Sequence, residues 1–294
     1  MNLLNSCPIC KMDLIEPYSM KWQLNFPHIS RSKCKSCGIV FANPVASYQE
    51  LQHFYTNYYD KGNFGALNYK LRIKEKIKEI SELNIQTITS KKEDILQYKN
   101  EGRFLDVGFG LGEDLFTFHH LGFDVYGTEY DADCIEFIKP YIPSAKLFNG
   151  DLLAANYPDE YFDVVNIYHV IEHLIDPVSY LLELKRILKP DGLLIIGTPN
   201  INAPAYQLYR FLNFASFQVP KIVDGLEHTV IFNKKNLGNL LVQNNFQILS
   251  HKNESLQDSL TNIFTSNLNF KKKIFRLAQT FVSVNQTLIV KKIG

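Results

Sequence analysis

Strong charge of either sign is absent from this sequence. Its 31 Lys and Arg residues nearly balance 30 Asp and Glu residues, so the formal net charge is +1 over 294 residues. A general nucleic-acid-binding protein usually carries a clear basic excess, so the balance does not support that class, although a local basic patch stays open. Apolar residues at 46% and charged residues at 21% exclude a disordered or collagen-like chain.

Long apolar runs are also missing. The longest uncharged stretch, around residues 193–209, contains Pro199 and Pro204, so it does not predict a membrane-spanning helix. The N-terminus, MNLLNSCPIC, lacks the basic region, the apolar region and the cleavage site of a secretory signal. We therefore expect a cytoplasmic protein without a membrane span.

Cysteine is scarce, and four of the five cysteines fall into two Cys-x2-Cys pairs. The pairs lie 23 residues apart and consist of Cys7, Cys10, Cys34 and Cys37. In a reducing compartment such pairs indicate a metal rather than disulfides. Pro8 and Gly38 favour tight turns at the pairs, so residues 1–45 are predicted to form a zinc ribbon with a structural Zn²⁺. An iron–sulfur cluster is the alternative for four thiolates.

Residues 46–100 are predicted to form a helical connector or cap. Apolar residues between Leu71 and Leu83 approximate a helical stripe, and the Lys residues beside them fit a solvated face. Aromatic residues gather between Tyr48 and Phe64. Such a cluster more often packs than binds a ligand, although a few of its members could line a site.

From Arg103 the pattern alternates between strands and helices. The strands are predicted at 103–107, 124–129, 145–148, 161–168, 192–198, 246–250 and 286–291, and the helices at 113–121, from 132, at 177–188 and at 236–245. This alternation predicts an α/β fold with a mostly parallel sheet covered by helices on both faces. Ligands bind such sheets beyond the carboxyl ends of the strands. The aromatic insert at 200–232 is expected to be a lid that excludes water.

A glycine turn follows the first of these strands, at Gly108, Gly110 and Gly112. Glycines let a cofactor approach the backbone closely. A dinucleotide-binding turn has glycines at the same place, but Glu113 stands here where that pattern has its third glycine. A carboxylate there would repel the pyrophosphate of a dinucleotide, which binds best at the positive N-terminus of a helix. This residue argues against a nicotinamide oxidoreductase.

Three acids stand at the ends of successive strands. Asp106 precedes the first glycine and suits a cationic ligand. Glu129 could accept hydrogen bonds from both hydroxyls of a ribose, and Asp151 could accept one from an adenine amino group. Ribose recognition of this kind is common to nicotinamide and adenosyl cofactors and does not separate them.

Five ordered blocks carry a family resemblance over about residues 100–250: DVGFGLG, GTEYD, GDL, FDVVNIYHVIEHLIDP and LKPDGLLIIGTPN. The set resembles the class I S-adenosylmethionine-dependent methyltransferases. The resemblance implies a Rossmann-like fold with a seven-stranded sheet over residues 101–294 and S-adenosylmethionine as the cofactor. Phe109, bulkier than usual, and Asp191, in place of a frequent Gly, are mild departures.

The resemblance also assigns cofactor contacts. It implies that Asp106, Gly108, Gly110 and Gly112 surround the methionine part, that Glu129 binds the ribose, that Asp151 and Leu152 meet the adenine, and that Tyr168 and His169 flank the sulfonium. We add Tyr130, next to Glu129, as a cofactor-binding residue.

The N-terminal segment CPIC…CKSCGIVFANP…ELQHFYTNYY is similar to the zinc-ribbon extension ahead of some bacterial methyltransferases. Several of those act in deoxysugar, surface-polysaccharide or secondary-metabolite pathways. The similarity implies a small-molecule acceptor, with a hydroxyl of a sugar or nucleotide-activated sugar as the leading expectation and nitrogen or carbon acceptors open. The sequence says nothing about the oligomeric state.

Transfer of a methyl group from a sulfonium requires an aligned acceptor and a group that takes its proton. His169 is predicted to be that base, because it follows the fourth strand at the cofactor edge. Glu227 and His228 are further candidates, since GLEHTVIFNKKNLGNLL is similar to a segment of zinc-ribbon sugar C-methyltransferases in which a Glu-His pair aids deprotonation. The Tyr that precedes that pair is absent here.

A catalytic metal is a separate alternative at the same place. His169-x-x-Glu172-His173 resembles the Glu-x-x-Glu-His metal site of ubiquinone-pathway and small-RNA O-methyltransferases, with His in place of the first Glu. Many relatives without a metal carry a similar His-Val-Leu-Glu-His segment. The competing interpretation is a structural role for Glu172 and His173.

Two other functions stay open. An RNA methyltransferase could grip its substrate with the ribbon, where residues 1–45 carry five Lys and Arg residues against two acids. The segment at 166–169 is Asn-Ile-Tyr-His and lacks the Pro-Pro of amino-group base methyltransferases, so we do not expect a nucleic-acid partner. The second open function is a non-enzymatic adaptor with a degenerate methyltransferase fold. The intact Asp106, Glu129 and Asp151 argue against this function.

Overall fold

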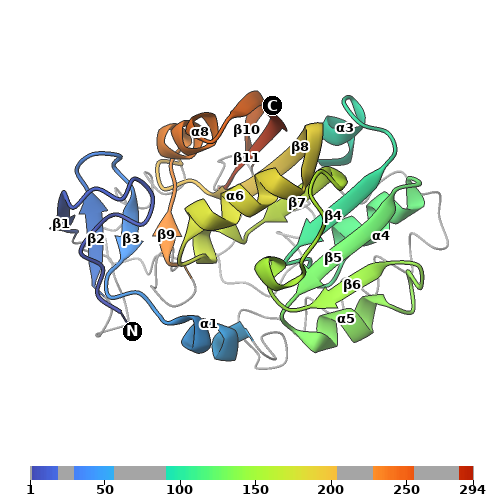
Figure 1. The fold of residues 1–294 in the computed structure, drawn as a ribbon, viewed down its shortest axis with the longest axis horizontal. Coiled ribbons are helices and arrows are strands. Elements are labelled where there is room, and N and C mark those ends of the chain that lie inside the picture. The colour runs from blue at the N-terminus through green and yellow to red at the C-terminus, as the bar shows by residue number, and fades with distance from the viewer. Residues whose placement is uncertain (1, 19–29, 56–90, 204–227, 255–284, 294) are drawn as a thin grey trace, which may run out of the picture.

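The computed structural model describes residues 2–18, 30–55, 91–203, 228–254 and 285–293 (Figure 1). Two sheets organise this part of the chain, one of seven strands and one of four. The larger sheet carries the predicted α/β pattern, and the smaller one belongs mainly to the N-terminal segment.

The seven-stranded sheet has the order β10-β11-β8-β7-β4-β5-β6. Its strands are β4 (Arg103–Val107), β5 (Asp124–Glu129), β6 (Lys146–Asn149), β7 (Phe162–Tyr168), β8 (Leu188–Pro199), β10 (Phe246–Glu254) and β11 (Asn285–Lys292). The pairs from β6 through β5, β4 and β7 to β8 are parallel, whereas β11 runs antiparallel to both of its neighbours. The predicted mostly parallel sheet is confirmed, and β4 and β7 are the neighbours at which the strand order reverses.

Helices cover both faces of this sheet because successive residues of a buried strand point to opposite sides. In β8, Leu194 and Ile196 pack with α6 (Pro177–Ile187) and α8 (Lys234–Gln243). Leu193 and Ile195 pack on the opposite face, in the cluster that includes residues of α3 (Lys91–Leu96), α4 (Glu113–His120) and α5 (Ala132–Ile138). Two short 3-10 helices, η2 (Leu152–Ala154) and η3 (Ile171–His173), follow β6 and β7.

Polar caps fix where the helices begin. Asp131 caps α5 by accepting from the Asp133 amide, and Asp176 caps α6, with Pro177 in the first turn. The helix predicted to start at residue 236 begins two residues earlier, at Lys234. Asn233 and Asn236 form a capping box there. The usual capping box has Glu or Gln at the third helical position, so Asn236 does not match the sequence pattern that marks a helix start.

The smaller sheet has the order β1-β2-β3-β9 and is antiparallel throughout. Its strands are β1 (Ile15–Pro17), β2 (Arg31–Cys34), β3 (Val40–Ala42) and β9 (Val230–Ile231). The predicted ribbon segment at 1–45 supplies three of these strands, and β9 lies at the end of the predicted insert. Residues 20–26, which by their sequence could form a strand between the two cysteine pairs, lie outside the described residues.

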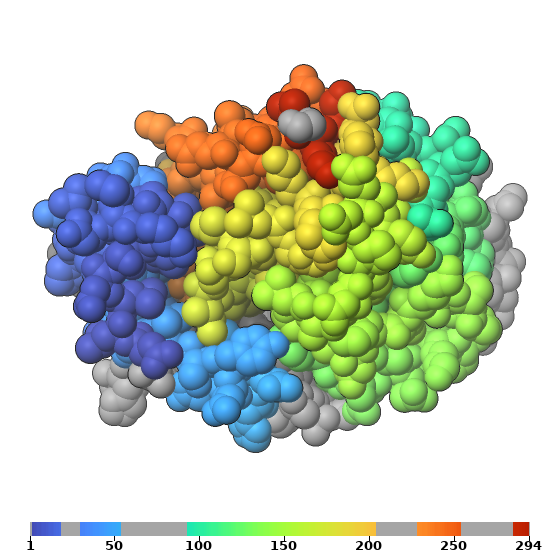
Figure 2. All heavy atoms as spheres, viewed as in Figure 1, coloured from blue at the N-terminus to red at the C-terminus, as the bar shows by residue number. Residues whose placement is uncertain are grey.

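The N-terminal unit, meaning residues 2–18 and 30–45, shares a hydrophobic core with the larger sheet. Ile39 and Phe41 of this unit are buried in the same cluster as Val230, Phe232 and Leu237. Figure 2 shows the blue N-terminal unit packed side by side with the yellow segment that contains α6. An exposed ion pair at 3.3 Å between Lys11 Nζ and Asp176 Oδ1 lies at this junction.

The predicted connector contains α1 (Tyr48–Tyr55) and α3, while the apolar stripe at 71–83 lies outside the described residues. The two ends of the predicted insert meet, because the Ile201 amide donates to the Phe232 carbonyl at 3.0 Å. Residues 204–227 of the insert are not described. Within the described ranges no helix is long and apolar enough to cross a membrane.

We predict that Phe41→Ala destabilises the whole chain. Phe41 is 1% exposed in the shared core, and truncating a buried Phe typically costs about 3–5 kcal/mol. Leu3→Ala is the matched control, because Leu3 is 76% exposed and such changes stay within about 0.5 kcal/mol. Urea unfolding followed by circular dichroism measures both. Separate transitions, with the larger sheet unaffected by Phe41→Ala, would contradict a shared core.

Candidate functional site

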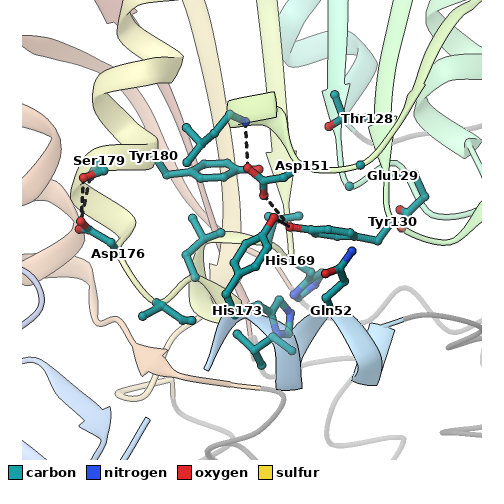
Figure 3. A pocket seen from close by; sticks show the side chains of 18 of the residues that line it. Gln52, Thr128, Glu129, Tyr130, Asp151, His169, His173, Asp176, Ser179 and Tyr180 are labelled. Atoms are coloured by element: carbon teal, nitrogen blue, oxygen red, sulfur yellow. Dashed lines mark hydrogen bonds between the residues drawn. The ribbon is translucent and has the colours of Figure 1, made fainter. Parts of the chain in front are cut away.

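A cavity of about 620 Å³ opens beyond the carboxyl ends of β4, β5 and β7 (Figure 3). Its volume is in the range of small-molecule sites. The lining residues come from the glycine turn, the end of β5, η2, the segment after β7, the start of α6, and α1. They include Gly108, Thr128, Glu129, Tyr130, Asp151, His169, His173, Asp176, Ser179, Tyr180, His228 and, from α1, Tyr48, Leu51 and Gln52.

The glycine turn needs Gly108 for two reasons. Its φ of +66° lies in the left-handed region, and a Cβ there would lie 2.6 Å from Val170 Cγ2. The Gly108 amide donates to the Thr128 carbonyl at 2.8 Å, which ties the turn to the end of β5. Phe109, the bulky departure from the family pattern, packs over Gly127, where a Cβ would lie 2.6 Å from its ring.

Glu129 holds the turn from the other side. Its Oε2 accepts from the Gly110 amide at 2.8 Å and its Oε1 from the Asp131 amide at 3.1 Å. The pKa of Glu129 is raised because burial outweighs these backbone hydrogen bonds, which by themselves would lower the pKa. The carboxylate therefore lies on the cavity wall in a fixed orientation.

Tyr130 and Asp151 form a second polar group on the cavity wall. The Tyr130 hydroxyl donates to Asp151 Oδ2 at 2.9 Å, and it lies 2.7 Å from the Tyr48 hydroxyl of α1. The Leu153 amide donates to Asp151 Oδ1 at 2.8 Å. Burial raises the pKa of the Tyr130 phenol, so this hydroxyl stays a hydrogen-bond donor at neutral pH.

Several predicted cofactor residues lie behind the cavity wall rather than on it. Asp106 is 4% exposed and its Oδ1 accepts from Asn166 Nδ2 at 2.7 Å. Leu152 is fully buried. The Tyr168 ring packs directly on Gly197, where an added Cβ would lie only 1.9 Å from the ring atom Cδ2. Among the described residues, Asp106, Gly110, Gly112, Leu152 and Tyr168 are not part of the cavity lining.

His169 follows β7 in a left-handed conformation, with φ of +56°. His is one of the residues that tolerate this region, and such strained positions gather at functional sites. Its Nδ1 lies 3.0 Å from Glu172 Oε1, and its Nε2 lies 3.3 Å from Asn285 Nδ2 of β11. The carboxylate favours a proton on Nδ1, which leaves Nε2 as the acceptor of the amide hydrogen.

Glu172 is a buried carboxylate at the centre of this group, with 1% of its surface exposed. Its Oε2 accepts from the Thr198 hydroxyl at 2.9 Å. Burial alone would raise the pKa of Glu172, but the hydrogen bond from His169 and the charge of His173 outweigh it and lower the pKa to about 2. Glu172 is therefore ionised at neutral pH.

Glu172, His173 and His228 each place a ligand atom within 4.8 Å of the other two, so this trio could hold a metal ion. The rings of His173 and His228 lie 4.9 Å apart. One carboxylate and two imidazoles suit several divalent transition metals. The structure thus brings His169 and His228, both predicted bases, to one cavity, while Glu227 lies outside the described residues.

The four paired cysteines converge within the N-terminal unit. Their sulfur atoms all lie within 4.8 Å of one another, with Cys7 3.6 Å from Cys37 and Cys10 3.5 Å from Cys34. The amides of Ile9 and Cys10 point at Cys7 Sγ, as expected for a turn that stabilises a thiolate. The hydrogen bond from Cys37 lowers the pKa of Cys7 to about 5. These residues could hold one metal ion.

Sequence reasoning missed three residues that support the histidines: Thr198, Thr229 and Asn285. Asn285 is 116 residues from His169, and no spacing rule connects the two. Thr198 ends a predicted strand, which is the one signal that could have placed it at the site. Tyr48, the first residue of the aromatic cluster at 48–64, lines the cavity, a role that the sequence left open for a few members of this cluster.

Comparison with known sequences identifies the family. Residues 72–251, more than half of the chain, match a family described as a methyltransferase domain. The chain belongs to this methyltransferase domain family. Its seven-stranded sheet is the Rossmann-like class I methyltransferase fold that the sequence blocks imply.

Individual relatives match this chain over shorter stretches. A probable S-adenosylmethionine-dependent methyltransferase of Mycolicibacterium smegmatis is 33% identical over 93 residues, 32% of this chain and 35% of that protein. A ubiquinone biosynthesis O-methyltransferase of Rhodopseudomonas palustris is 31% identical over 109 residues, 36% of this chain and 43% of that protein. The matches thus span less than half the length of these relatives.

Solved structures agree on the fold of this chain. A geranyl diphosphate C-methyltransferase from Streptomyces coelicolor A3(2) has a TM-score of 0.50 at 15% identity, covering 69% of this chain and 78% of that one. A chain from the complex of the Haloferax volcanii Trm112 methyltransferase activator with a methyltransferase has a TM-score of 0.54 at 13% identity, covering 70% and 89%. At these identities the likeness shows the fold alone.

We predict that the stabilising contribution of the Glu172 charge disappears in acid. Because the pKa of Glu172 is lowered from 4.5 to about 2 in the folded chain, its contribution is present above pH 4.5 and is lost as the pH falls toward 2. The loss should be on the order of 3 kcal/mol. Urea unfolding of wild type and Glu172→Gln at several pH values measures it. A stability gap that stays constant with pH would contradict the assigned ionisation.

Proposed function

We propose that this protein transfers a methyl group from S-adenosylmethionine to a hydroxyl of a small molecule, a sugar or a nucleotide-activated sugar. One observation carries the proposal: Gly108 and Glu129 line the same cavity at the strand ends as the three histidines His169, His173 and His228. A cofactor bound at the first group would present its methyl group toward the second.

The cofactor half of the site has the required chemistry. Gly108 leaves room for close approach to the backbone, Glu129 offers a carboxylate to ribose hydroxyls, and Asp151 is placed to accept from an adenine amino group. Asp106 lies one layer behind, where its charge favours a ligand ammonium at the turn. S-adenosylmethionine carries all of these partner groups, and it supplies the activated methyl group when bound.

The histidine half supports proton removal. An acceptor hydroxyl must lose its proton as the new bond forms, and a neutral imidazole is suited to take it. Glu172 orients His169 through Nδ1, so Nε2 is the basic atom, with the Asn285 amide as its present partner. His228 stands on the same cavity beside His173 and is the second candidate base, with Glu227 next to it in the chain.

The sugar-type acceptor rests on the N-terminal unit. The chain pairs a four-cysteine unit with a methyltransferase domain, the arrangement it shares with enzymes of deoxysugar and surface-polysaccharide pathways. In a zinc tetrathiolate, Zn–S bonds of about 2.3 Å give sulfur–sulfur distances of about 3.8 Å. The shortest sulfur separations here, 3.5 and 3.6 Å, fit such a tetrahedron, which supports a structural Zn²⁺ at Cys7, Cys10, Cys34 and Cys37.

We predict one tightly held zinc ion per chain, lost in Cys34→Ser. Elemental analysis by inductively coupled plasma mass spectrometry measures it, with His228→Ala as the control that keeps all four thiols. Iron in place of zinc would contradict the assignment. A further metal that is lost in His228→Ala and kept in Cys34→Ser would establish the divalent site at Glu172, His173 and His228 as the second candidate mechanism.

The acceptor class is tested with radiolabelled S-adenosylmethionine in an extract of source cells that lack this protein, after adding the purified chain. Label is then partitioned between small metabolites, polysaccharide or lipid-linked glycan, and RNA. We expect label in the metabolite or glycan fraction. Label in RNA would overturn the proposal and make the N-terminal unit an RNA-binding module, and absence of any transfer would favour a non-enzymatic adaptor.

Once an acceptor is in hand, His169→Ala should lower kcat by about 10²–10⁴, the usual contribution of a general base, with little change in affinity for S-adenosylmethionine. His228→Ala should lower it less if His228 is only the second base. His251→Ala is the matched control, because His251 bonds Gln286 in the sheet. Full activity of His169→Ala would remove His169 from the mechanism.

A further inference from the structure

We infer that the four-cysteine unit positions the histidines of the active site, with Thr229 as the residue that connects the two. This inference rests on the proposed function, since it concerns the end of the cavity at which the acceptor loses its proton. It assigns the N-terminal unit a part in the reaction beyond folding, and it names a positioning residue that the sequence motifs do not contain.

Thr229 is 1% exposed and bonds in two directions. Toward the N-terminal unit, its carbonyl accepts from the Ala42 amide at 2.7 Å. Toward the active site, its amide donates to the Glu172 carbonyl at 2.8 Å, and its hydroxyl lies 2.6 Å from the Leu174 carbonyl and 3.0 Å from the Glu172 carbonyl. One residue thus links β3 to the 3-10 turn that carries Glu172 and His173.

The path from the metal ligands to Thr229 is short. Cys34 is the last residue of β2, and its amide donates to the Ile39 carbonyl across the turn that carries Cys37. That turn leads directly into β3, which pairs with β9 through Val40–Ile231 and Phe41–Val230. A metal held by the thiolates would therefore fix the hairpin of β2 and β3, and β3 pairs with β9.

His228 is the residue immediately before Thr229, so the position of β9 along β3 also sets the position of this imidazole. On the other side of Thr229, the bonds to Glu172 and Leu174 hold both ends of the segment that contains His173. The two histidine rings, 4.9 Å apart, are thus held by a single buried threonine.

The cofactor half is held by different elements. Gly108 follows β4 and its amide donates to the Thr128 carbonyl of β5, while Glu129 ends β5 and accepts from the Gly110 amide of the glycine turn. Losing the Thr229 bonds should therefore disturb the histidines and spare the cofactor site. This separation distinguishes a positioning role from a general loss of structure.

Thr229→Val tests the inference, because it keeps the shape and the β9 backbone but removes the hydroxyl. Thr229→Ser keeps the hydroxyl and is the conservative rescue. Thr117→Val is the matched control: Thr117 is fully buried and its hydroxyl also donates to a backbone carbonyl, that of Glu113, within α4. All variants are prepared as the full chain with its metal.

The first readout does not depend on activity. In chains labelled with ¹³C at histidine Cε1, Thr229→Val should shift the ring signals of His173 and His228 and leave those of His119 and His251 in place. The second readout is kinetic: kcat should fall between about tenfold and a hundredfold through misplacement, while the Kd for S-adenosylmethionine stays within about twofold. Thr229→Ser should restore both, and Thr117→Val should change neither.

Unmoved His173 and His228 signals in folded Thr229→Val, or cofactor affinity that falls as much as kcat, would overturn the inference. If the wild-type chain transfers no methyl group to any acceptor, the proposed function fails. The histidine signals still decide in that case whether Thr229 positions the two rings.

Discussion

The ionised carboxylate of Glu172 is the interaction on which the site depends. Burying a charge costs several kcal/mol unless hydrogen bonds and opposite charge compensate, so its surroundings cannot vary freely. Thr198 of β8 and His169 after β7 bond its two oxygens, and His173 and His228 stand close by. These partners come from three segments of the chain, and the need to satisfy one carboxylate brings them to the same place.

The backbone of the same residue extends this constraint to the N-terminal unit. Thr229 accepts from β3 and donates to Glu172, so the small sheet with the four cysteines and the segment after β7 meet at this one residue. The shared core around Phe41 and Phe232 stabilises that junction. The cysteine unit is therefore built into the methyltransferase domain and is more than an appended module. In the proposed function, acceptor and proton chemistry lie at the junction, and cofactor binding lies at the strand ends beyond it.

The sheet could be predicted from the sequence, and so could the position of Gly108, Glu129 and Asp151 at one cavity, because their signals are local. Strand and helix periods alternate from Arg103, and Gly108, Glu129 and Asp151 follow adjacent strands whose carboxyl ends must meet. The histidine half could be predicted only in part. His169 is marked by its place after β7, but Asn285 and Thr229 reach the site through pairings between distant segments. β9 has two residues, too few for any periodicity, and so the strand that joins the two sheets has no sequence signal.

In the proposed function, one cavity has a cofactor half and a proton-handling half that act separately. Calorimetric titration of S-adenosylmethionine into wild type, Glu129→Gln and Glu172→Gln tests it most directly. The account predicts binding to wild type, strongly weakened binding to Glu129→Gln, and binding to folded Glu172→Gln close to that of wild type. A wild-type chain that does not bind S-adenosylmethionine, or a Glu172→Gln chain that loses it as fully as Glu129→Gln, would contradict the account.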